Sequence, residues 1–517
     1  MNPIDTVVAS RPHLHDVRSC DEWLARAALS DPHHACSSFI ELLDELEDAP
    51  PNAAYRVTIL ERLRGPMRAA LEQQERRFGS RPLPLGPAED AAFDQACDLW
   101  LAALRAWREL LNHASRDAQL DAVRPLLALR VLECGAGLTG AHFVARREVD
   151  QSVWHWVHQS YAQAESLRLA ETPVDKSGES STCSALYAEV LLLALAHPYG
   201  LSQRELGWTR RWARRWAPKV KLWRAAENGG GYAVDLEGCA PPAWTRAGEP
   251  GAALRYLQCS EVARSIRKRL KKLAEGVQPG ALGLGRDCTR PAAEPLLTSL
   301  LRCWTDAPFV RQFPRRAVQG PVQLASGLDD IYRVLSPAPF QSGAKSWEYS
   351  RRSTEQLQIF QRAIEMEQRA ASACAMETWE TLDESANGFR VRRRSAGMRL
   401  AHGQLVALRP RNAGQAMLCE VRWLYENREH ALHAGLRALP GLPQPCGVRV
   451  AAEQESHAAT WSPAFVVPGA AERASLVLPV GWYQPHRSLE LRQDGTRTIT
   501  LLSLLDRGYD FDRVSFA

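Results

Sequence analysis

The sequence predicts an α+β multidomain protein, in which an all-α N-terminal region is followed by an antiparallel β-barrel with a helical insertion and additional C-terminal strands. Two patterns predict this fold class: apolar residues recur at helical spacing up to about residue 300, and short β-branched runs alternate with glycine and polar turns from Val318 onward. The chain has 517 residues. At roughly 100–200 residues per domain, this length indicates about three domains.

The N-terminal region, residues 1–300, is expected to be helical and to bind a protein partner. Ser202 with Glu205 three residues later is a capping-box signature, and the helix that follows carries three tryptophans four residues apart, ending at Trp216. Further helices are predicted at 39–46, 91–111, 120–131, 153–169 and 184–196. Glycine and proline mark expected loops at 79–87, 172–181 and 229–250.

The C-terminal half is expected to contain a barrel at residues 305–440 and further strands at 445–517. The density of short strands fits one or two small barrels or sandwiches, so residues 445–517 either extend the first barrel or form a second small β-domain. Strands are predicted at 320–325, 327–335, 389–391, 405–408, 417–425, 435–439, 447–450, 464–467, 475–480, 488–491 and 496–502.

A helical insertion is expected to interrupt the barrel at about residues 340–378. Within it, Leu357, Phe360 and Ile364 recur at helical spacing, which predicts a polar-rich helix at about 353–378.

Composition favours a soluble cytoplasmic protein. Lysine plus arginine is 64 and aspartate plus glutamate is 59, so the net charge of +5 is compatible with an anionic ligand but does not require nucleic acid. The 12 cysteines show no C-x-x-C spacing, so we expect free thiols and no bound metal. We also expect no signal peptide, no membrane span and no cofactor, and the absence of catalytic motifs predicts that the protein is not an enzyme.

Two short motifs are candidates for a binding site. The first is Arg311-Gln-Phe-Pro-Arg315, followed by Arg316; its proline disfavours helix, so the arginines are expected to extend from a loop ahead of a strand. The second is Asp383-Glu-Ser385-Ala-Asn-Gly388, which runs directly into a predicted strand.

These motifs resemble the signature of the PilZ family of cyclic-di-GMP receptors, Arg-x-x-x-Arg followed by Asp-x-Ser-x-x-Gly. The later segments Gly403-Gln-Leu-Val and Glu420-Val-Arg-Trp are also similar to strands of such barrels, so the resemblance covers roughly residues 305–440. It implies a bacterial effector that binds cyclic di-GMP and passes the signal to a protein partner, with a role in surface attachment, pilus motility or a related behaviour.

The residue types suit this ligand. An arginine binds the O6 and N7 edge of guanine bidentately, reaches phosphate and stacks on a purine face. Asp383 and Ser385 offer acceptors for the guanine N–H donors, and Gly388 is expected to allow the backbone to approach the ligand closely or to adopt a positive φ. The candidate ligand-binding residues are therefore Arg311, Arg315, Arg316, Asp383, Ser385 and Gly388.

The spacing departs from compact members of that family, because Arg315 and Asp383 lie 68 residues apart, and the inserted helix would account for the gap. An alternative is that Arg351 and Arg352 supply the ligand arginines. Plainer interpretations are a solvated basic loop for the arginines and a simple hairpin turn for Asp383 to Gly388. Ligand-driven ordering of the arginine segment is the expected mechanism of signalling.

The run Arg264–Lys272 is strongly basic. A solvated helix face is the plainest interpretation, docking to an acidic partner the next, and nucleic-acid binding, which we do not expect, the third. The alternative function is accordingly a nucleic-acid-binding or scaffold protein that uses its basic helices and whose barrel binds no ligand.

Overall fold

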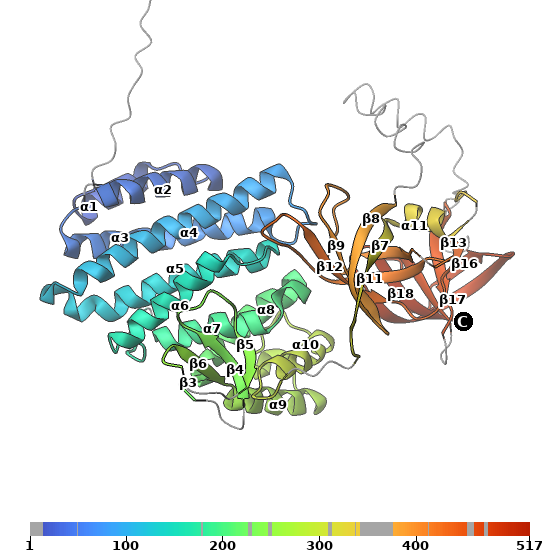
Figure 1. Cartoon of the computed structure of the whole chain (residues 1–517). Helices are drawn as coiled ribbons and strands as arrows, with labels where there is room; N and C mark the ends of the chain where they lie inside the picture. Colours follow the sequence, from blue (N-terminus) through green and yellow to red (C-terminus); the bar gives the residue numbers. More distant parts are fainter. Residues whose placement is uncertain are drawn as a thin grey trace, which may run out of the picture. The chain divides into compact units, whose positions relative to one another are not determined.

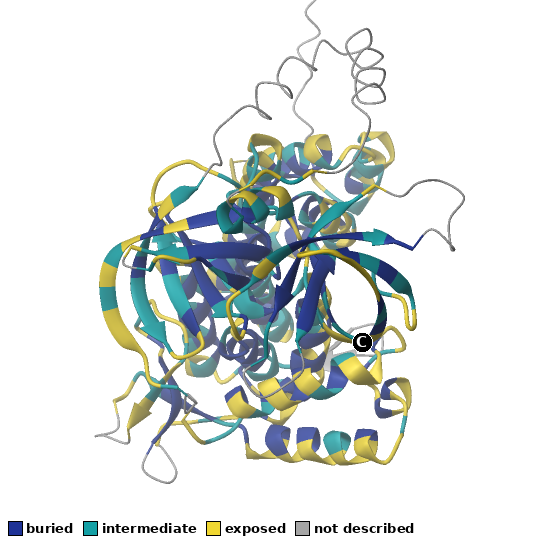
Figure 2. Cartoon of the chain, turned by 90° about the vertical axis from the view of Figure 1, so that its right-hand side faces the viewer, coloured by how far each residue is buried: buried dark blue, intermediate teal, exposed yellow. Residues whose placement is uncertain are grey.

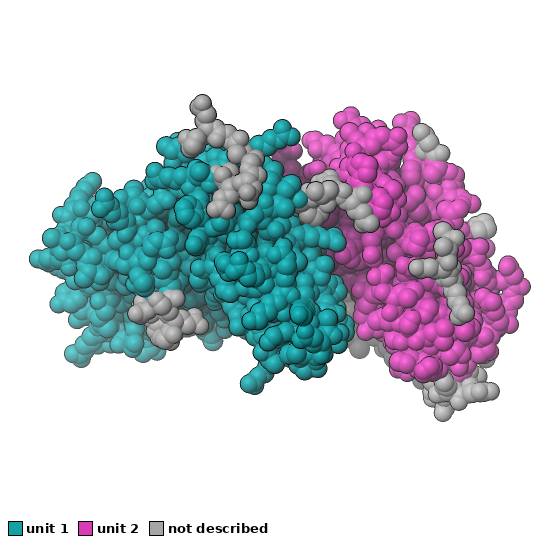
Figure 3. Space-filling view, turned by 90° about the horizontal axis from the view of Figure 1, so that it is seen from below, with its two compact units in different colours: residues 1–81, 85–310 teal, residues 82–84, 311–517 magenta. Residues whose placement is uncertain are grey.

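The structure of the protein is a computed structural model. It describes residues 14–48, 50–176, 179–225, 230–246, 251–308, 313–336, 338–341, 376–411, 413–451, 460–469 and 474–517. The chain divides into two compact units, one of residues 1–81 and 85–310 and the other of residues 82–84 and 311–517 (Figure 3).

The first unit is mainly helical, as expected from the apolar spacing. Its long central helices lie side by side, and the helix at 124–145 is buried around most of its circumference, which is why its residues are apolar on all sides (Figure 1). The helices of this unit are α1 (Val17–Arg26), α2 (Pro32–Asp48), α3 (Ala53–Phe78), α4 (Pro87–Ala114), α5 (Arg124–Ala145), α6 (Gln151–Ser166), α7 (Cys183–Leu195), α8 (Gln203–Trp216), α9 (Ser260–Ala274) and α10 (Arg290–Cys303).

The local signals around α8 are confirmed. The Ser202 backbone N–H donates to the Glu205 carboxylate at 2.8 Å, and the Glu205 N–H donates to Ser202 Oγ at 3.3 Å, which completes the capping box. All three tryptophans of α8 are buried, so the face that they share packs into the core of the unit.

Two small sheets correct the expectation that this region is all-α. A hairpin of β1 (Val174–Lys176) and β2 (Glu179–Ser181) lies where a loop was predicted. A four-stranded sheet has the order β3-β6-β4-β5, with β4 and β5 also inside a predicted loop. These strands are three to six residues long, too short to show a period beside their glycines and prolines. Their bounds are β3 (Lys221–Trp223), β4 (Gly230–Asp235), β5 (Ala243–Arg246) and β6 (Leu254–Gln258).

The second unit begins with a closed antiparallel barrel of order β10-β11-β12-β9-β8-β7. Residues that face its interior, such as Val391, Leu424 and Ala434, are fully buried, and buried positions recur along the strands (Figure 2). The strands are β7 (Arg316–Ser326), β8 (Glu377–Ser385), β9 (Gly388–Arg393), β10 (Leu405–Pro410), β11 (Met417–Glu426) and β12 (Leu432–Ala438).

One predicted strand of this barrel is wrong. Residues 327–335 form helix α11 (Leu328–Leu335), because Leu328, Ile331 and Leu335 recur at i, i+3 and i+7. Ile331 is fully buried against the barrel core. Residues 342–375, which hold most of the helix predicted at 353–378, lie outside the described residues, and the last two residues of that prediction, 377 and 378, belong to strand β8 instead.

Residues from 444 onward close into a second barrel of order β13-β14-β15-β18-β17-β16. The two barrels share an apolar cluster in which Leu405 of the first meets Phe465 and Phe511 of the second. The Leu405 N–H also donates to Asp510 Oδ1 at 2.9 Å. The strands are β13 (Gln444–Val450), β14 (Ser462–Val467), β15 (Ser475–Pro479), β16 (Ser488–Arg492), β17 (Thr496–Arg507) and β18 (Phe511–Phe516).

The predicted fold class, helices followed by antiparallel β-barrels, is confirmed by this architecture. Among the helices that the structure describes, none combines the length and the apolar character needed to cross a lipid bilayer.

Candidate functional site

The pairing of β7 with β8 brings the two predicted motifs together. In this ladder Arg316 lies opposite Glu384, and Ala317 lies opposite Asp383. The Arg315 guanidinium donates to Asp383 Oδ1, and Arg316 Nη2 lies 2.9 Å from Glu384 Oε1. The two motifs, 68 residues apart in the sequence, therefore meet on two neighbouring strands. The chain leaves β7 and returns to β8 at the other end of this strand pair.

The structure describes only part of the arginine motif. Arg315 is partly buried, with 28% of its side chain exposed, and Arg316 is open to solvent with 81% exposed. Arg311 lies outside the described residues, and so do Arg351 and Arg352. The choice between the two sets of arginines therefore stays a prediction.

The Asp-x-Ser-x-x-Gly motif forms the tight connection between β8 and β9. Ser385 lies opposite Gly388 in the ladder, and the Ser385 hydroxyl donates to the Gly388 carbonyl at 3.3 Å. The Ala438 N–H of β12 donates to the Asn387 carbonyl at 3.0 Å, which fixes the tip of the turn. The hydroxyl of Ser385 thus holds the turn in shape.

The reason for a glycine at 388 differs from the expected one. Gly388 is not among the residues with positive φ. Instead, a Cβ atom at this position would lie 2.0 Å from the Leu436 carbonyl oxygen of β12. The glycine therefore permits the close approach of two strands.

A row of polar and aromatic side chains crosses the outer face of the barrel from this motif. In the strand ladders, Asp383 on β8 lies opposite Arg390 on β9. Arg390 lies opposite Gly435 on β12, and Gly435 lies opposite Trp423 on β11. Residues directly opposite in antiparallel strands point to the same face, so the carboxylate, the guanidinium and the indole lie in line. Arg390 Nε has no hydrogen-bond partner among the described residues.

The indole of Trp423 lies over Gly435 and occupies the space that a larger side chain at this position would need. A Cβ on this glycine would lie 2.0 Å from Trp423 Nε1, so any larger residue would push the ring outward. The half-buried indole thus offers an aromatic surface beside Arg390. Sequence reasoning assigned Trp423 to a barrel strand but missed it and Arg390 as site residues, because only the register across β8, β9, β12 and β11 aligns them with Asp383.

The adjacent row on the same face contains a buried histidine. His433 on β12 lies between Arg392 of β9 and Tyr425 of β11, and its ring stacks on Tyr425 with centroids 5.1 Å apart. The residue is 5% exposed, and neither ring nitrogen has a hydrogen-bond partner among the described residues. Burial, followed by the charges of Arg390, Arg392 and Arg394, lowers the pKa of His433 to about 4. The imidazole is therefore neutral near pH 7.

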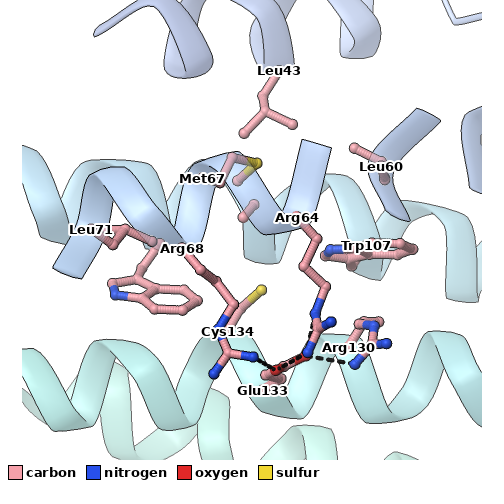
Figure 4. A pocket seen from close by; sticks show the side chains of 12 residues that line it. Leu43, Leu60, Arg64, Met67, Arg68, Leu71, Trp107, Arg130, Glu133 and Cys134 are labelled. Carbon is pink, nitrogen blue, oxygen red and sulfur yellow. Dashed lines mark hydrogen bonds and ion pairs between the residues drawn. The ribbon is translucent and has the colours of Figure 1, made fainter. Parts of the chain in front are cut away.

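A pocket in the helical unit is a second place where charges converge (Figure 4). Arg64, Arg68 and Arg130 point toward Glu133 from α3 and α5, beside the ring of Trp107. Burial raises the pKa of Glu133, but the Arg64 hydrogen bond and the charges of the three arginines outweigh it, so that the pKa is lowered. The enclosed space is about 20 Å³, which holds a water molecule but no nucleotide. This cluster therefore ties α3 to α5.

No group of three or more histidine, cysteine, aspartate or glutamate side chains is placed to hold a metal ion within the part of the chain that the structure describes.

The fold defines the class of the protein: a helical unit joined to two β-barrels, the first of which carries carboxylate, guanidinium and aromatic groups on one face. Family comparisons give a more specific result. Residues 18–225 match the N-terminal domain of the cyclic-di-GMP receptor FimW, and residues 446–517 match the FimW C-terminal β-barrel domain. Both describe one family, and together they span more than half of the chain, which therefore belongs to the FimW family of cyclic-di-GMP receptors.

No curated protein matches the chain with significance. Neither family match covers the first barrel at 316–438, so the resemblance of that barrel to PilZ domains stays a prediction. The match at 446–517 starts inside β13 and covers the remaining strands of the second barrel, in agreement with a β-barrel domain at this end.

Proposed function

We propose that this protein is an effector that binds cyclic di-GMP on the outer face of its first barrel and transmits the level of this second messenger to a protein partner. The single observation that carries the site is the Arg315–Asp383 ion pair, which unites the two motifs across the β7–β8 pair. Membership of a cyclic-di-GMP receptor family supports the ligand.

The ion pair suggests how binding and signalling are linked. Without ligand, Asp383 is neutralised by Arg315. A guanine base offers N–H donors to the Asp383 carboxylate, which frees the guanidinium for the O6 and N7 edge of guanine or for phosphate. The segment before β7 is thereby drawn onto the ligand. Since a ligand shifts an equilibrium only through different affinities for two states, this exchange of partners is the step that couples binding to conformation.

Arg390 and Trp423 extend the proposed site across β9 and β11. The half-buried guanidinium of Arg390 can donate to a phosphate or a guanine edge, and the indole can stack on a base. Stacking is worth roughly 1–3 kcal/mol per base. One guanine would then lie near Asp383 and the second near Trp423, with the phosphates between them.

Calorimetric titration of the full chain with cyclic di-GMP tests the proposal, with GTP and cyclic di-AMP as control ligands. Arg315→Ala and Asp383→Ala should each weaken binding by about 10–100-fold, because a hydrogen bond to a charged group contributes about 1.5–3 kcal/mol. Arg311→Ala is tested separately, and it should also weaken binding because Arg311 belongs to the first motif. Arg394→Ala is the matched control, since this arginine lies on the same barrel with 63% of its side chain exposed.

If wild type, Arg315→Ala and Asp383→Ala bind cyclic di-GMP equally, the binding site does not lie on this face, although cyclic di-GMP remains the ligand. No heat with cyclic di-GMP in the wild-type protein would overturn the function itself.

A further inference from the structure

The solvent side of helix α9 carries a compact set of cations, which we call the α9 basic face. It consists of Arg267, Lys268, Lys271 and Lys272, all exposed. None of these four side chains has an ion-pair partner within the described residues, whereas Arg264 on the same side pairs with Glu261 at 2.7 Å. At 100° per residue they lie within one side of the helix. Four unneutralised cations therefore lie within six consecutive residues.

The opposite side of α9 is firmly packed, so the basic face is held in a fixed orientation on its unit. Val262, Ile266 and Leu273 are fully buried. Arg269, at the border of the two sides, lies over the ring of Trp216 with its guanidinium carbon 5.1 Å from the ring centroid. The helix thus presents its cations from a rigid support at the edge of the helical unit (Figure 1).

Neighbouring strand β3 and the turn before it extend the positive surface. Lys219 donates to Ser265 Oγ of α9 at 2.7 Å. Lys221 lies opposite Gln258 in the β3–β6 ladder, two residues before α9 begins. Trp223, on the same strand, is 48% exposed. Exposed tryptophan beside arginine and lysine is the composition that recurs at the centres of protein interfaces, where tryptophan and arginine carry much of the binding energy.

This arrangement of like charges destabilises the helix. Arg267 with Lys271, and Lys268 with Lys272, are like charges at i, i+4, and each such pair destabilises an isolated helix by about 0.2–0.5 kcal/mol. The helix dipole favours cations only in the last turn, which leaves Arg267 and Lys268 without this compensation. An anionic partner would relieve the repulsion.

We propose that the α9 basic face is the docking surface for an acidic segment of a partner protein. Ala274 is the one apolar residue of α9 that is exposed, and its methyl group is too small to anchor the helix in a lipid bilayer, unlike the large apolar side chains of helices that bind membranes. Exposed Glu275 stands at the C-terminal end and would repel a phosphate chain that continues past the helix, and at the other end Glu261 neutralises Arg264, so the unpaired cations do not extend to that end. A short cluster of carboxylates complements this bounded stripe better than a long polyanion does.

Three probes of different class test the proposal on the full-length protein: an acidic peptide rich in glutamate, a single-stranded DNA of equal charge, and vesicles of phosphatidylcholine with phosphatidylglycerol. The peptide should bind, more weakly as salt is raised through the physiological range, because exposed charges are screened. The variant Lys268→Glu/Lys271→Glu/Lys272→Glu should lose about tenfold or more of the affinity, since each exposed pair contributes about 0.2–1 kcal/mol and reversal replaces attraction by repulsion.

The matched control reverses the same charge elsewhere on the unit, as Arg76→Glu/Arg116→Glu/Arg168→Glu, three exposed arginines of which the first lies on α3 and the other two in the connections that follow α4 and α6. It should bind the peptide like wild type. The helical circular dichroism of both variants should be unchanged, and neutral Lys→Gln replacements at the three lysines of α9 should give an intermediate loss.

Equal peptide binding by wild type and the α9 variant would overturn the proposal, as would equal losses in the α9 and control variants. Tighter binding of the DNA or of the vesicles than of the peptide would assign the face to nucleic acid or to a membrane instead.

Discussion

Replacing Gly388 by alanine should damage the barrel and the proposed ligand site together. The Cβ of alanine would lie 2.0 Å from the Leu436 carbonyl oxygen, whereas distances below 3.0 Å are essentially never observed, so β9 and β12 must separate by about 1 Å. The pairs nearest the contact are Gly388 with Arg437 and Phe389 with Leu436. Loss of roughly two hydrogen bonds at about 1 kcal/mol each predicts a cost of about 2 kcal/mol.

Part of this cost is offset, because alanine restricts the unfolded chain more than glycine by about 0.4–1 kcal/mol. The net destabilisation of about 1.5 kcal/mol corresponds to a fall in Tm of roughly 3–6 °C for a unit of about 200 residues. Differential scanning calorimetry of the full chain measures it. The affinity for cyclic di-GMP should fall as well, because the displaced turn carries Asp383 and Ser385.

Gly320→Ala is the matched control. Gly320 lies on β7 of the same barrel and has no positive φ, and the position that an alanine Cβ would take has no neighbouring atom within 4 Å, so alanine should leave the Tm unchanged or slightly raised. If Gly388→Ala melts and binds ligand like Gly320→Ala, the close approach of β9 and β12 does not constrain this turn, and the reasoning is refuted.

Two further predictions concern buried titratable side chains of the first barrel. Because the pKa of His433 is about 4 in the folded state and 6.5 for the free side chain, the unfolded chain takes up a proton first as the pH falls, so this residue should cost stability between about pH 6.5 and 4, by at most roughly 3 kcal/mol. Urea unfolding across this range should show a slope that His433→Leu removes, and an unchanged slope would contradict it. Glu377→Ala should destabilise the barrel by about 3–5 kcal/mol, because the Arg393 side chain, 2% exposed, loses its carboxylate partner. Glu380→Ala, whose partner Arg392 is 21% exposed, should cost far less, and equal losses in urea unfolding would refute the argument.

Local patterns predicted much of the fold. Helices α2, α4, α6, α7 and α8 and the capping box at Ser202 follow from spacing and end signals that operate within a few residues, whereas α5 was predicted only over its first part and α1 and α3 were not assigned. Strand β8 was missed, because its sequence Glu-Thr-Trp-Glu-Thr-Leu-Asp-Glu-Ser has only two strongly apolar residues and follows a stretch with helical spacing. The helix at 328–335 was assigned to a strand, since in eight residues a buried helix and a buried strand contain similar apolar residues.

The candidate site, like the fold, was predicted only in part. The motifs at Arg315 and Asp383 are visible in the sequence because each occupies a few adjacent residues. Their union across the insertion was predicted from the resemblance to the PilZ signature, and the β7–β8 register places the two side chains in contact. Arg390 and Trp423 could not be assigned, because their alignment with Asp383 depends on two β-bulges and on the order of four strands.

By itself, the sequence determined the helical first half, the strand-rich second half and the two motifs with their chemistry, since these depend on periodicity and on residue types in short windows. Only the tertiary structure decided that the last strands close a separate barrel, that Gly388 serves strand packing, and that a carboxylate, a guanidinium and an indole share one face. Strand pairing joins residues far apart in the chain, and a shift of one residue in register would turn each side chain to the opposite face.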